Sequence, residues 1–350
     1  MLQVSKRPAD ADDFYGKRQR LDVALQGEDA STKPRTSSLL APIMLLTGHE
    51  GEIFASRFSK NGKYLASAGF DQKILLWNVH GQCENFATLK GHTGAILDVH
   101  FSTDSNFVFS CGTDKTVRIF DMEDGRCVRR FRGHSEIVNS CHPARRGPTI
   151  VASASDDGTV LINDVRAKHP TLKINSLHNY QVTSVTFNDN AQEIICGGID
   201  NTLKQWDLRR GLLNTFEGHD DSITGLSLSP DGRFVLSNSM DCTARIWDIQ
   251  PFAPSERCVR VFHGHQHNFE KNLLKTAWSP DSKRISVGSS DRFTYVYDVA
   301  KASVEYKLPG HQGSVNAVDF HPEELILLSA ASDKKIYLGE LEPCTSPNTL

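Results

Sequence analysis

Histidine, serine and aspartate recur along the chain at spacings that could support metal binding or proton transfer. The tightest histidine group is His263, His265 and His267. Alternate residues of a strand share one face, an arrangement that can suit zinc or copper. However, His265 has counterparts throughout the chain, whereas a catalytic or metal-binding constellation occurs at one place. No phosphate-binding loop, nucleophile elbow or His-Glu-x-x-His helix is present, so we expect no catalytic residue, no metal and no cofactor.

The recurring histidine opens a repeated unit, usually directly after a glycine. Successive turn histidines are 41 to 46 residues apart and define units one to seven: His49, His92, His134, His178, His219, His265 and His311. In each unit a short alternating strand, a polar turn and a second strand follow. A turn aspartate then precedes the third strand: Asp71, Asp114, Asp157, Asp200, Asp241, Asp291 and Asp333. A period of about 40 to 45 residues is typical of a four-stranded propeller blade, so the 350 residues are expected to form one large repeat domain.

These residues carry a resemblance to the WD-repeat (WD40) family, from about Ala41 to Leu341. The resemblance implies a hydrogen-bonded tetrad in each blade, made by the turn histidine, a serine or threonine, the turn aspartate and a tryptophan. Units one and five match it fully: His49, Ser67, Asp71, Trp77 and His219, Ser237, Asp241, Trp247. The other units depart at Phe120, Asn163, Cys196, Val287 with Tyr297, and Gly339. Because a half-satisfied polar network is costly, those blades should depend more on packing.

The predicted fold is an all-β, seven-bladed propeller whose ring is closed by an N-terminal strand. Ala41 to Thr47 reads as an orphan strand before the first unit, while only ten residues follow Glu340, too few for a fourth strand. We expect residues 42–47 to pair with the last blade and cover its open edge. The predicted domains are a disordered tail at 1–38, the propeller at 39–342 and a C-terminal tail at 343–350.

Composition limits the compartment and the partners. The formal net charge is −3 and the pI is about 6.5, so any RNA contact should be indirect or local. Eight cysteines without a Cys-x-x-Cys pair indicate reduced thiols of an intracellular protein, and no apolar stretch is long enough to cross a membrane. Two basic clusters, comprising Lys6, Arg7, Lys17, Arg18 and Arg20, resemble a bipartite nuclear localisation signal, and the alternative is a solvated charge run.

The resemblance also implies which side chains point outward at the end of the ring where the turn histidines lie. In this chain those positions hold Phe54, Phe70, Leu97, Ile137, Ile199, Met240 and Leu274. An exposed apolar cluster predicts a protein interface, although several of these side chains could instead pack into the blades.

Two irregular segments add candidate contacts. The loop of unit six contains Phe269 and is about four residues longer than the loop of unit five. Extra loop length on a propeller usually serves recognition. Unit three has Arg145 and Arg146 in a turn, where they would suit an acidic partner or a phosphate, or simply face solvent.

Stretches outside the generic repeat, such as Ala144 to Pro148 and Lys335 to Glu340, resemble a spliceosomal branch of the family. That resemblance implies a nuclear, non-catalytic scaffold, a monomeric propeller within a large complex. Its expected partners are a very large central splicing protein and the helicase and GTPase beside it. The alternative function is a substrate receptor of a cullin-type ubiquitin ligase, suggested by Trp206 to Arg209, although short motifs recur by chance. A reader of modified peptides would need an aromatic or acidic pocket at the central channel.

Overall fold

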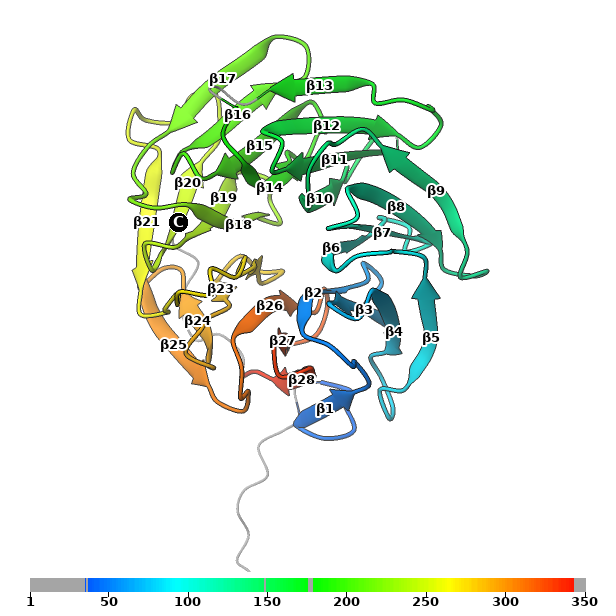
Figure 1. Cartoon of the computed structure of the whole chain (residues 1–350). Helices are drawn as coiled ribbons and strands as arrows, with labels where there is room; N and C mark the ends of the chain where they lie inside the picture. Colours follow the sequence, from blue (N-terminus) through cyan, green and yellow to red (C-terminus); the bar gives the residue numbers. More distant parts are fainter. Residues whose placement is uncertain (1–34, 36, 148, 176–178, 343–350) are drawn as a thin grey trace, which may run out of the picture. The chain divides into compact units, whose positions relative to one another are not determined.

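The computed structural model describes residues 35, 37–147, 149–175 and 179–342. They form seven antiparallel four-stranded sheets arranged as blades around a central channel (Figure 1). This result confirms the predicted all-β, seven-bladed propeller. The basic residues Lys6, Arg7, Lys17, Arg18 and Arg20, the remainder of segment 1–34 and the tail at 343–350 lie outside the described residues. Within the described part of the chain, no helix is long and apolar enough to cross a membrane.

Each blade takes its strands from one sequence unit, apart from the strand that closes the ring. Blade one contains β2 (Ile53–Phe58), β3 (Tyr64–Gly69), β4 (Lys73–Asn78) and β5 (Asn85–Lys90), and blade two contains β6 (Ile96–Phe101), β7 (Phe107–Gly112), β8 (Thr116–Asp121) and β9 (Cys127–Arg132). Blade three contains β10 (Val138–Pro143), β11 (Ile150–Ser155), β12 (Thr159–Asp164) and β13 (Leu172–Asn175), and blade four contains β14 (Val182–Phe187), β15 (Glu193–Gly198), β16 (Leu203–Asp207) and β17 (Gly211–Phe216). Blade five contains β18 (Ile223–Leu228), β19 (Phe234–Ser239), β20 (Thr243–Asp248) and β21 (Cys258–His263), and blade six contains β22 (Thr276–Trp278), β23 (Arg284–Val287), β24 (Thr294–Asp298) and β25 (Ser303–Leu308). Blade seven contains β26 (Val315–Phe320), β27 (Ile326–Ala331), β28 (Lys335–Glu340) and the N-terminal strand β1 (Ile43–Thr47).

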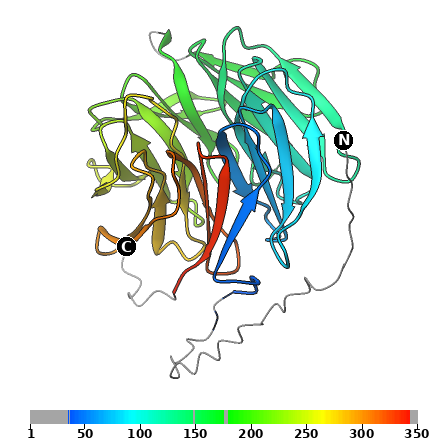
Figure 2. The ribbon, with the colours of Figure 1, turned by 60° about the horizontal axis from the view of Figure 1, so that its bottom comes forward.

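Strand β1 closes the ring by pairing with β28, as the sequence predicts. The antiparallel register runs from Ile43 opposite Gly339 to Thr47 opposite Lys335. Figure 2 shows the two strands, one from each end of the propeller sequence, side by side in blue and red. Leu46 is 3% exposed and belongs to a core cluster that joins blades seven and one. The closing strand therefore contributes both backbone pairing and apolar burial.

Residues just before β1 also contact blade seven. The Arg35 guanidinium lies 2.8 Å from a Glu340 carboxylate oxygen, and the Ser38 hydroxyl donates to Glu324 at 2.7 Å. Leu39 is buried and forms a parallel bridge with Gly81 of blade one. Among the described residues, contacts with the ring therefore include Arg35 and Ser38, which were predicted to belong to the disordered tail.

The innermost strand of each blade lines the channel, and strand alternation decides which side chains face it. In β2 and β6, a bulge after the first residue shifts the register, at Ile53 to Ala55 and at Ile96 to Asp98. The third and fifth residues of the innermost strands then point into the channel, because successive side chains alternate between faces. The intervening residues pack between blades, where the apolar core clusters lie. Polar residues at third and fifth positions are therefore brought together from different blades.

Candidate binding sites

The turn histidines of units one and five each bind a serine and an aspartate of their own blade. In unit one, Nδ1 of His49 lies 2.7 Å from an Asp71 carboxylate oxygen, and Nε2 lies 2.7 Å from the Ser67 hydroxyl. The Trp77 indole nitrogen donates to that hydroxyl at 2.8 Å. Unit five repeats this geometry at 2.8, 2.7 and 2.8 Å, with His219, Asp241, Ser237 and Trp247. Each set ties a turn to two strands.

The carboxylates of these two sets stay ionised. Burial alone would raise the pKa values of Asp71 and Asp241, but hydrogen bonds from His49 and His219 outweigh it, and both pKa values are lowered. All hydrogen-bond capacity of the histidine rings is used inside the blade. The arrangement suits structural rigidity and leaves no free base for proton transfer.

The departing units keep part of this network. The histidine still binds serine and aspartate in units two, three and seven, at 2.8 to 3.1 Å: His92 with Ser110 and Asp114, His134 with Ser153 and Asp157, and His311 with Ser329 and Asp333. Asn163 of unit three is buried, and its Oδ1 has no hydrogen-bond partner among the described atoms. In unit seven, Gly339 leaves the tryptophan place empty, and the Tyr337 ring packs edge-on against His311 instead, with centroids 4.7 Å apart. His178 of unit four lies outside the described residues.

Unit six differs from the arrangement expected within its own blade. Its third-strand Tyr297 hydroxyl lies 3.0 Å from His265 Nδ1, and His265 Nε2 lies 2.9 Å from the Asn238 side-chain oxygen of blade five. Val287 offers no hydroxyl to Nε2, and Tyr297 occupies Nδ1 in place of the turn aspartate. Asp291 instead accepts the Tyr295 hydroxyl at 2.6 Å. Asn238 also donates to His267 at 3.2 Å, so the chain of hydrogen bonds crosses between blades.

This cross-blade chain requires neutral imidazoles. Burial, followed by the neighbouring His267, lowers the pKa of His265 to about 3, and burial lowers the pKa of His267 to about 4. Among the residues that the structure describes, no group of three or more histidine, cysteine, aspartate or glutamate side chains is arranged to hold a metal. His265 and His267 therefore have a structural explanation that needs no ion.

The apolar side chains expected to face outward do not all do so. Phe70, Ile199 and Phe269 are exposed, at 65, 40 and 90%. Phe54, Leu97, Ile137 and Met240 are half-buried. The prediction for Leu274 is wrong, because this residue is fully buried and its carbonyl accepts the Thr224 hydroxyl at 3.3 Å. The extra residues of the unit-six loop lie before Leu274, which is followed by Lys275 and then by the innermost strand β22.

The exposed members of this set are distributed over separate blades. Phe70 directly follows β3 of blade one. Its backbone amide donates to the Glu52 carbonyl at 2.8 Å, so Phe70 lies beside the start of strand β2, which contains Phe54. Ile199 follows β15 of blade four, and Phe269 lies in the connection between β21 and β22. The structure brings Phe54 and Phe70 together at blade one, while the others offer separate contact points at the same end of the ring.

The two arginines of unit three have different environments. Arg145 is half-buried, and its guanidinium donates to the carbonyls of Leu228 and Ser229, both at 2.9 Å. Arg146 is exposed and lies 3.3 Å from an Asp189 carboxylate oxygen. Because Arg145 turns into the channel, the pair does not form one surface patch.

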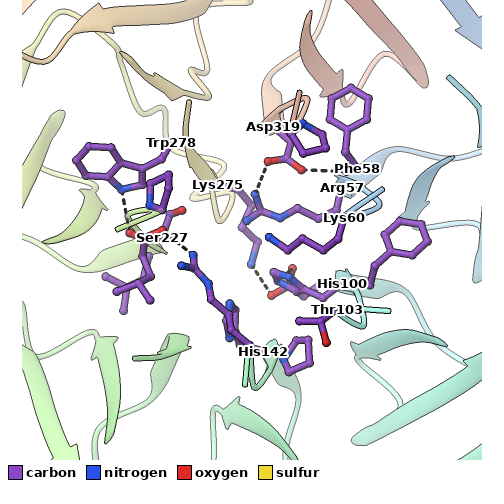
Figure 3. Close-up of a pocket in the computed structure, with 18 of the residues that line it drawn as sticks. Arg57, Phe58, Lys60, His100, Thr103, His142, Ser227, Lys275, Trp278 and Asp319 are labelled. Atoms are coloured by element: carbon purple, nitrogen blue, oxygen red, sulfur yellow. Dashed lines mark hydrogen bonds and ion pairs between the residues drawn. The ribbon is translucent and has the colours of Figure 1, made fainter. Parts of the chain in front are cut away.

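A cavity of about 420 Å³ occupies the channel where the innermost strands end, and residues of all seven blades line it (Figure 3). Arg57 pairs with Asp319 at 3.2 Å, and Lys275 pairs with Asp98 at 3.3 Å. Figure 3 shows Lys60 extending into the same space. The cavity lies at the opposite end of the channel from Phe70, because the innermost strands begin near the turn histidines and end here.

Burial and neighbouring charges shift the pKa values of the ionisable side chains that line the cavity. Lys60 keeps an exposed side chain, but the partial loss of water around it in the cavity, followed by the charge of Arg145, lowers its pKa. Burial also lowers the pKa values of His100 and His142, so both imidazoles are neutral near pH 7. Burial would raise the pKa of Asp98, but the ammonium of Lys275 holds that pKa well below its usual range. The lining therefore carries more positive than negative side chains, and its aromatic residues are buried at 6 or 7% exposure, so they form no open cage of the kind that binds methyl-lysine.

Comparison with known proteins identifies the family. The model of the WD domain, G-beta repeat, matches residues 40–78, 83–121, 125–164, 171–207, 210–248, 256–298 and 302–338. The chain belongs to the WD40 family.

Curated relatives of this WD40 protein match it over nearly their whole length. It is 58% identical to the U5 small nuclear ribonucleoprotein 40 kDa protein of Bos taurus, over 88% of this chain and 86% of that protein. It is 51% identical to the protein of the same name from Dictyostelium discoideum, over 88% of this chain and 87% of the relative. It is 41% identical to the pre-mRNA-splicing factor cwf17 of Schizosaccharomyces pombe, over 93% of this chain and 95% of the relative.

The channel site of this WD40 protein was not predicted from the sequence, although a signal for it is present. Strands β14 and β18 hold only small residues at their third and fifth positions, namely Ser184, Thr186, Gly225 and Ser227. Other innermost strands place charged or histidine side chains there, namely Arg57, Asp98, His100, His142 and Asp319, and Lys275 directly precedes β22. Charged residues at these positions could have been recognised as channel-lining groups once the alternation of each strand was assigned.

Proposed function

We propose that this WD40 protein is a non-catalytic scaffold of the U5 small nuclear ribonucleoprotein that acts in pre-mRNA splicing. One observation carries the proposal. Relatives with the U5 40 kDa name are 51 to 58% identical across 86 to 87% of their own length and 88% of this chain, so the similarity extends over most of the chain. Generic WD40 similarity would be expected to concentrate in the repeated positions alone.

The mechanism we propose is docking without turnover, onto the large central splicing protein and beside the helicase and GTPase of the particle. A closed ring whose blades are tied by buried hydrogen bonds offers preorganised surfaces, which reduces the entropy lost on association. Phe70, Ile199 and Phe269 supply exposed apolar anchors at one end of the ring, with Phe54 beside Phe70. Half-buried Leu97, Ile137 and Met240 would contribute at the edges of such contacts.

The proposal includes a nuclear location, with Lys6, Arg7, Lys17, Arg18 and Arg20 acting as the localisation signal. Deleting Met1 to Arg20 from a fluorescent fusion should reduce nuclear accumulation. Unchanged accumulation would remove this role from the basic clusters, and the docking proposal would stand without it.

Affinity purification from nuclear extract tests the scaffold directly. The tagged full chain should recover splicing proteins, including one very large protein, as identified by mass spectrometry. Phe269→Ala should weaken recovery, since this side chain is 90% exposed and truncating an apolar anchor commonly costs more than about 1 kcal/mol. Recovery of other nuclear complexes without splicing proteins would contradict the proposal.

The same purification distinguishes the ligase-receptor alternative. Arg209 is exposed after β16, in a turn where its amide donates to Asp207 at 2.7 Å, so its side chain is accessible to a partner. Arg209→Ala should leave the recovery of splicing proteins unchanged. Recovery of a cullin adaptor that depends on Arg209 would instead favour the receptor function.

A further inference from the structure

The channel cavity holds more positive than negative side chains. Its lining includes four cations, Arg57, Lys60, Arg145 and Lys275, and three carboxylates, Asp98, Asp189 and Asp319. Near pH 7 the lowered pKa values of the two lining histidines, His100 and His142, leave both neutral. The imbalance stands out in a chain whose formal net charge is −3.

The three carboxylates are already engaged. Asp319 pairs with Arg57 at 3.2 Å and accepts the Phe58 amide at 2.9 Å. Asp98 pairs with Lys275 at 3.3 Å and accepts the Ser140 hydroxyl at 2.8 Å. The remaining carboxylate, Asp189, pairs at 3.3 Å with Arg146, which is outside the cavity lining.

Two of the four cations, Lys60 and Arg145, form no direct ion pair in the part of the chain that the structure describes. Arg145 donates to two backbone carbonyls, which orient its guanidinium, and the more remote carboxylates of Asp189 and Asp231 offset only part of its charge. The charge of Asp319 likewise acts on Lys60 without a direct contact. These two side chains come from blades one and three and line the same cavity, where the charge of Arg145 contributes to lowering the pKa of Lys60. Such repulsion costs stability, and a bound anion would relieve it.

The walls of the cavity favour a peptide over a nucleic acid. Aromatic residues surround it, namely Phe58, Phe101, Trp278 and Phe320, yet each is 6 or 7% exposed and packed into the blades. The Trp278 indole is further fixed by donation to the Ser227 carbonyl at 3.1 Å. Binding of single-stranded RNA uses exposed rings on which bases stack, and these rings are unavailable. Proline side chains from four blades, Pro143, Pro230, Pro280 and Pro322, instead offer apolar contact at the rim.

We propose that this end of the channel binds an acidic segment of a partner protein, which inserts an anionic side chain between Lys60 and Arg145. A volume of about 420 Å³ accommodates such a side chain with its flanking backbone. The bound anion balances the excess positive charge of the cavity, and the prolines at the rim contact the rest of the segment. The inference goes beyond the scaffold function proposed above, because it depends only on the cavity and holds whichever complex contains the chain.

Fluorescence anisotropy with the full chain and labelled hexapeptides tests the site. Hexaglutamate should bind and hexaglutamine should not. Lys60→Gln should weaken hexaglutamate binding at least about tenfold, because the variant loses the ammonium group and its charge-assisted hydrogen bond to the anion. Lys63→Gln is the matched control, because Lys63 is exposed in the same turn but does not line the cavity, and it should leave the affinity unchanged.

Two further arms decide the chemistry of the ligand. A hexapeptide with phosphoserine in place of one glutamate distinguishes a phosphoryl group from a carboxylate as the preferred anion, and Lys60-dependent binding of either supports the site. A single-stranded RNA hexamer that displaces hexaglutamate and binds more tightly would overturn the peptide assignment. Equal affinity for hexaglutamate and hexaglutamine, or equal effects of Lys60→Gln and Lys63→Gln, would overturn the site itself. Matching melting temperatures of the two variants exclude misfolding as the cause.

Discussion

The closing strand β1 offers a sharp test of how this ring is held together, because two adjacent leucines on it have opposite environments. Leu46 is 3% exposed and lies opposite Ile336 of β28, inside the core between blades seven and one. Leu45 is 50% exposed on the outer side of the same strand. Leu46→Ala and Leu45→Ala therefore remove the same atoms from the same strand, and only the first creates a cavity.

The magnitude of the difference follows from this burial. Truncating a fully buried leucine costs about 2 to 5 kcal/mol, whereas a surface substitution stays within about 0.5 kcal/mol. At about 2 °C per kcal/mol for a domain of this size, Leu46→Ala should lower the melting temperature by about 4 to 10 °C and Leu45→Ala by about 1 °C or less. A chain that begins at Gly48 loses Leu46, Leu39 and the whole pairing with β28, so its loss should be larger.

Differential scanning calorimetry measures these shifts, and light scattering reports aggregation. The chain that begins at Gly48 exposes the unpaired edge of β28 and should aggregate, while a chain that begins at Ser38 keeps β1 and should stay monomeric. Equal melting temperatures for the two leucine variants, or for the two shortened chains, would refute closure of the ring by β1.

Two further outcomes test the hydrogen-bond networks. Ser67→Ala removes the hydroxyl that accepts from the Trp77 indole and binds His49 Nε2. It should lower the free energy of unfolding, measured by urea denaturation, by about 2 to 4 kcal/mol. A loss below about 0.5 kcal/mol would contradict the role of the tetrad. In the folded chain the pKa values of His265 and His267 are lowered from 6.5 to about 3 and about 4, so the unfolded chain binds protons first as the pH falls. Stability should therefore be complete above pH 6.5 and decline between about pH 6.5 and 4, by up to about 1.4 kcal/mol per pH unit for each histidine, and His267→Asn should flatten this decline.

The repeat itself could be read from the sequence because each blade needs the same local chemistry. Turn histidines, turn aspartates and alternating strands keep their phase along the chain, and the unpaired segment before the first unit predicted the closing strand that β1 forms with β28. The departures at Asn163 and Gly339 were also recognisable, since each replaces a residue type that the pattern requires.

Predictions failed where a side chain depends on a neighbouring blade. Leu274 was expected to face outward because unit six was matched backward from Ser279 and Pro280, but this position is fully buried, as is Thr224 at the matching place of unit five. His265 was expected to bond within its own blade, yet it bonds to Asn238 of blade five. Arg145 was expected beside Arg146 on the surface, but it reaches the carbonyls of Leu228 and Ser229 across the channel.

The sequence by itself determined the seven-bladed ring, its closure and the residues that stabilise units one and five. Those features arise from contacts within a single repeat or from pairing of complementary edges, and short-range spacing encodes them. Only the tertiary structure decided that Lys60 and Arg145, far apart in the chain, share one cavity with a cationic excess. The physical reason is that strand alternation sends single residues from every blade into a common channel, and their charges combine only when the ring closes.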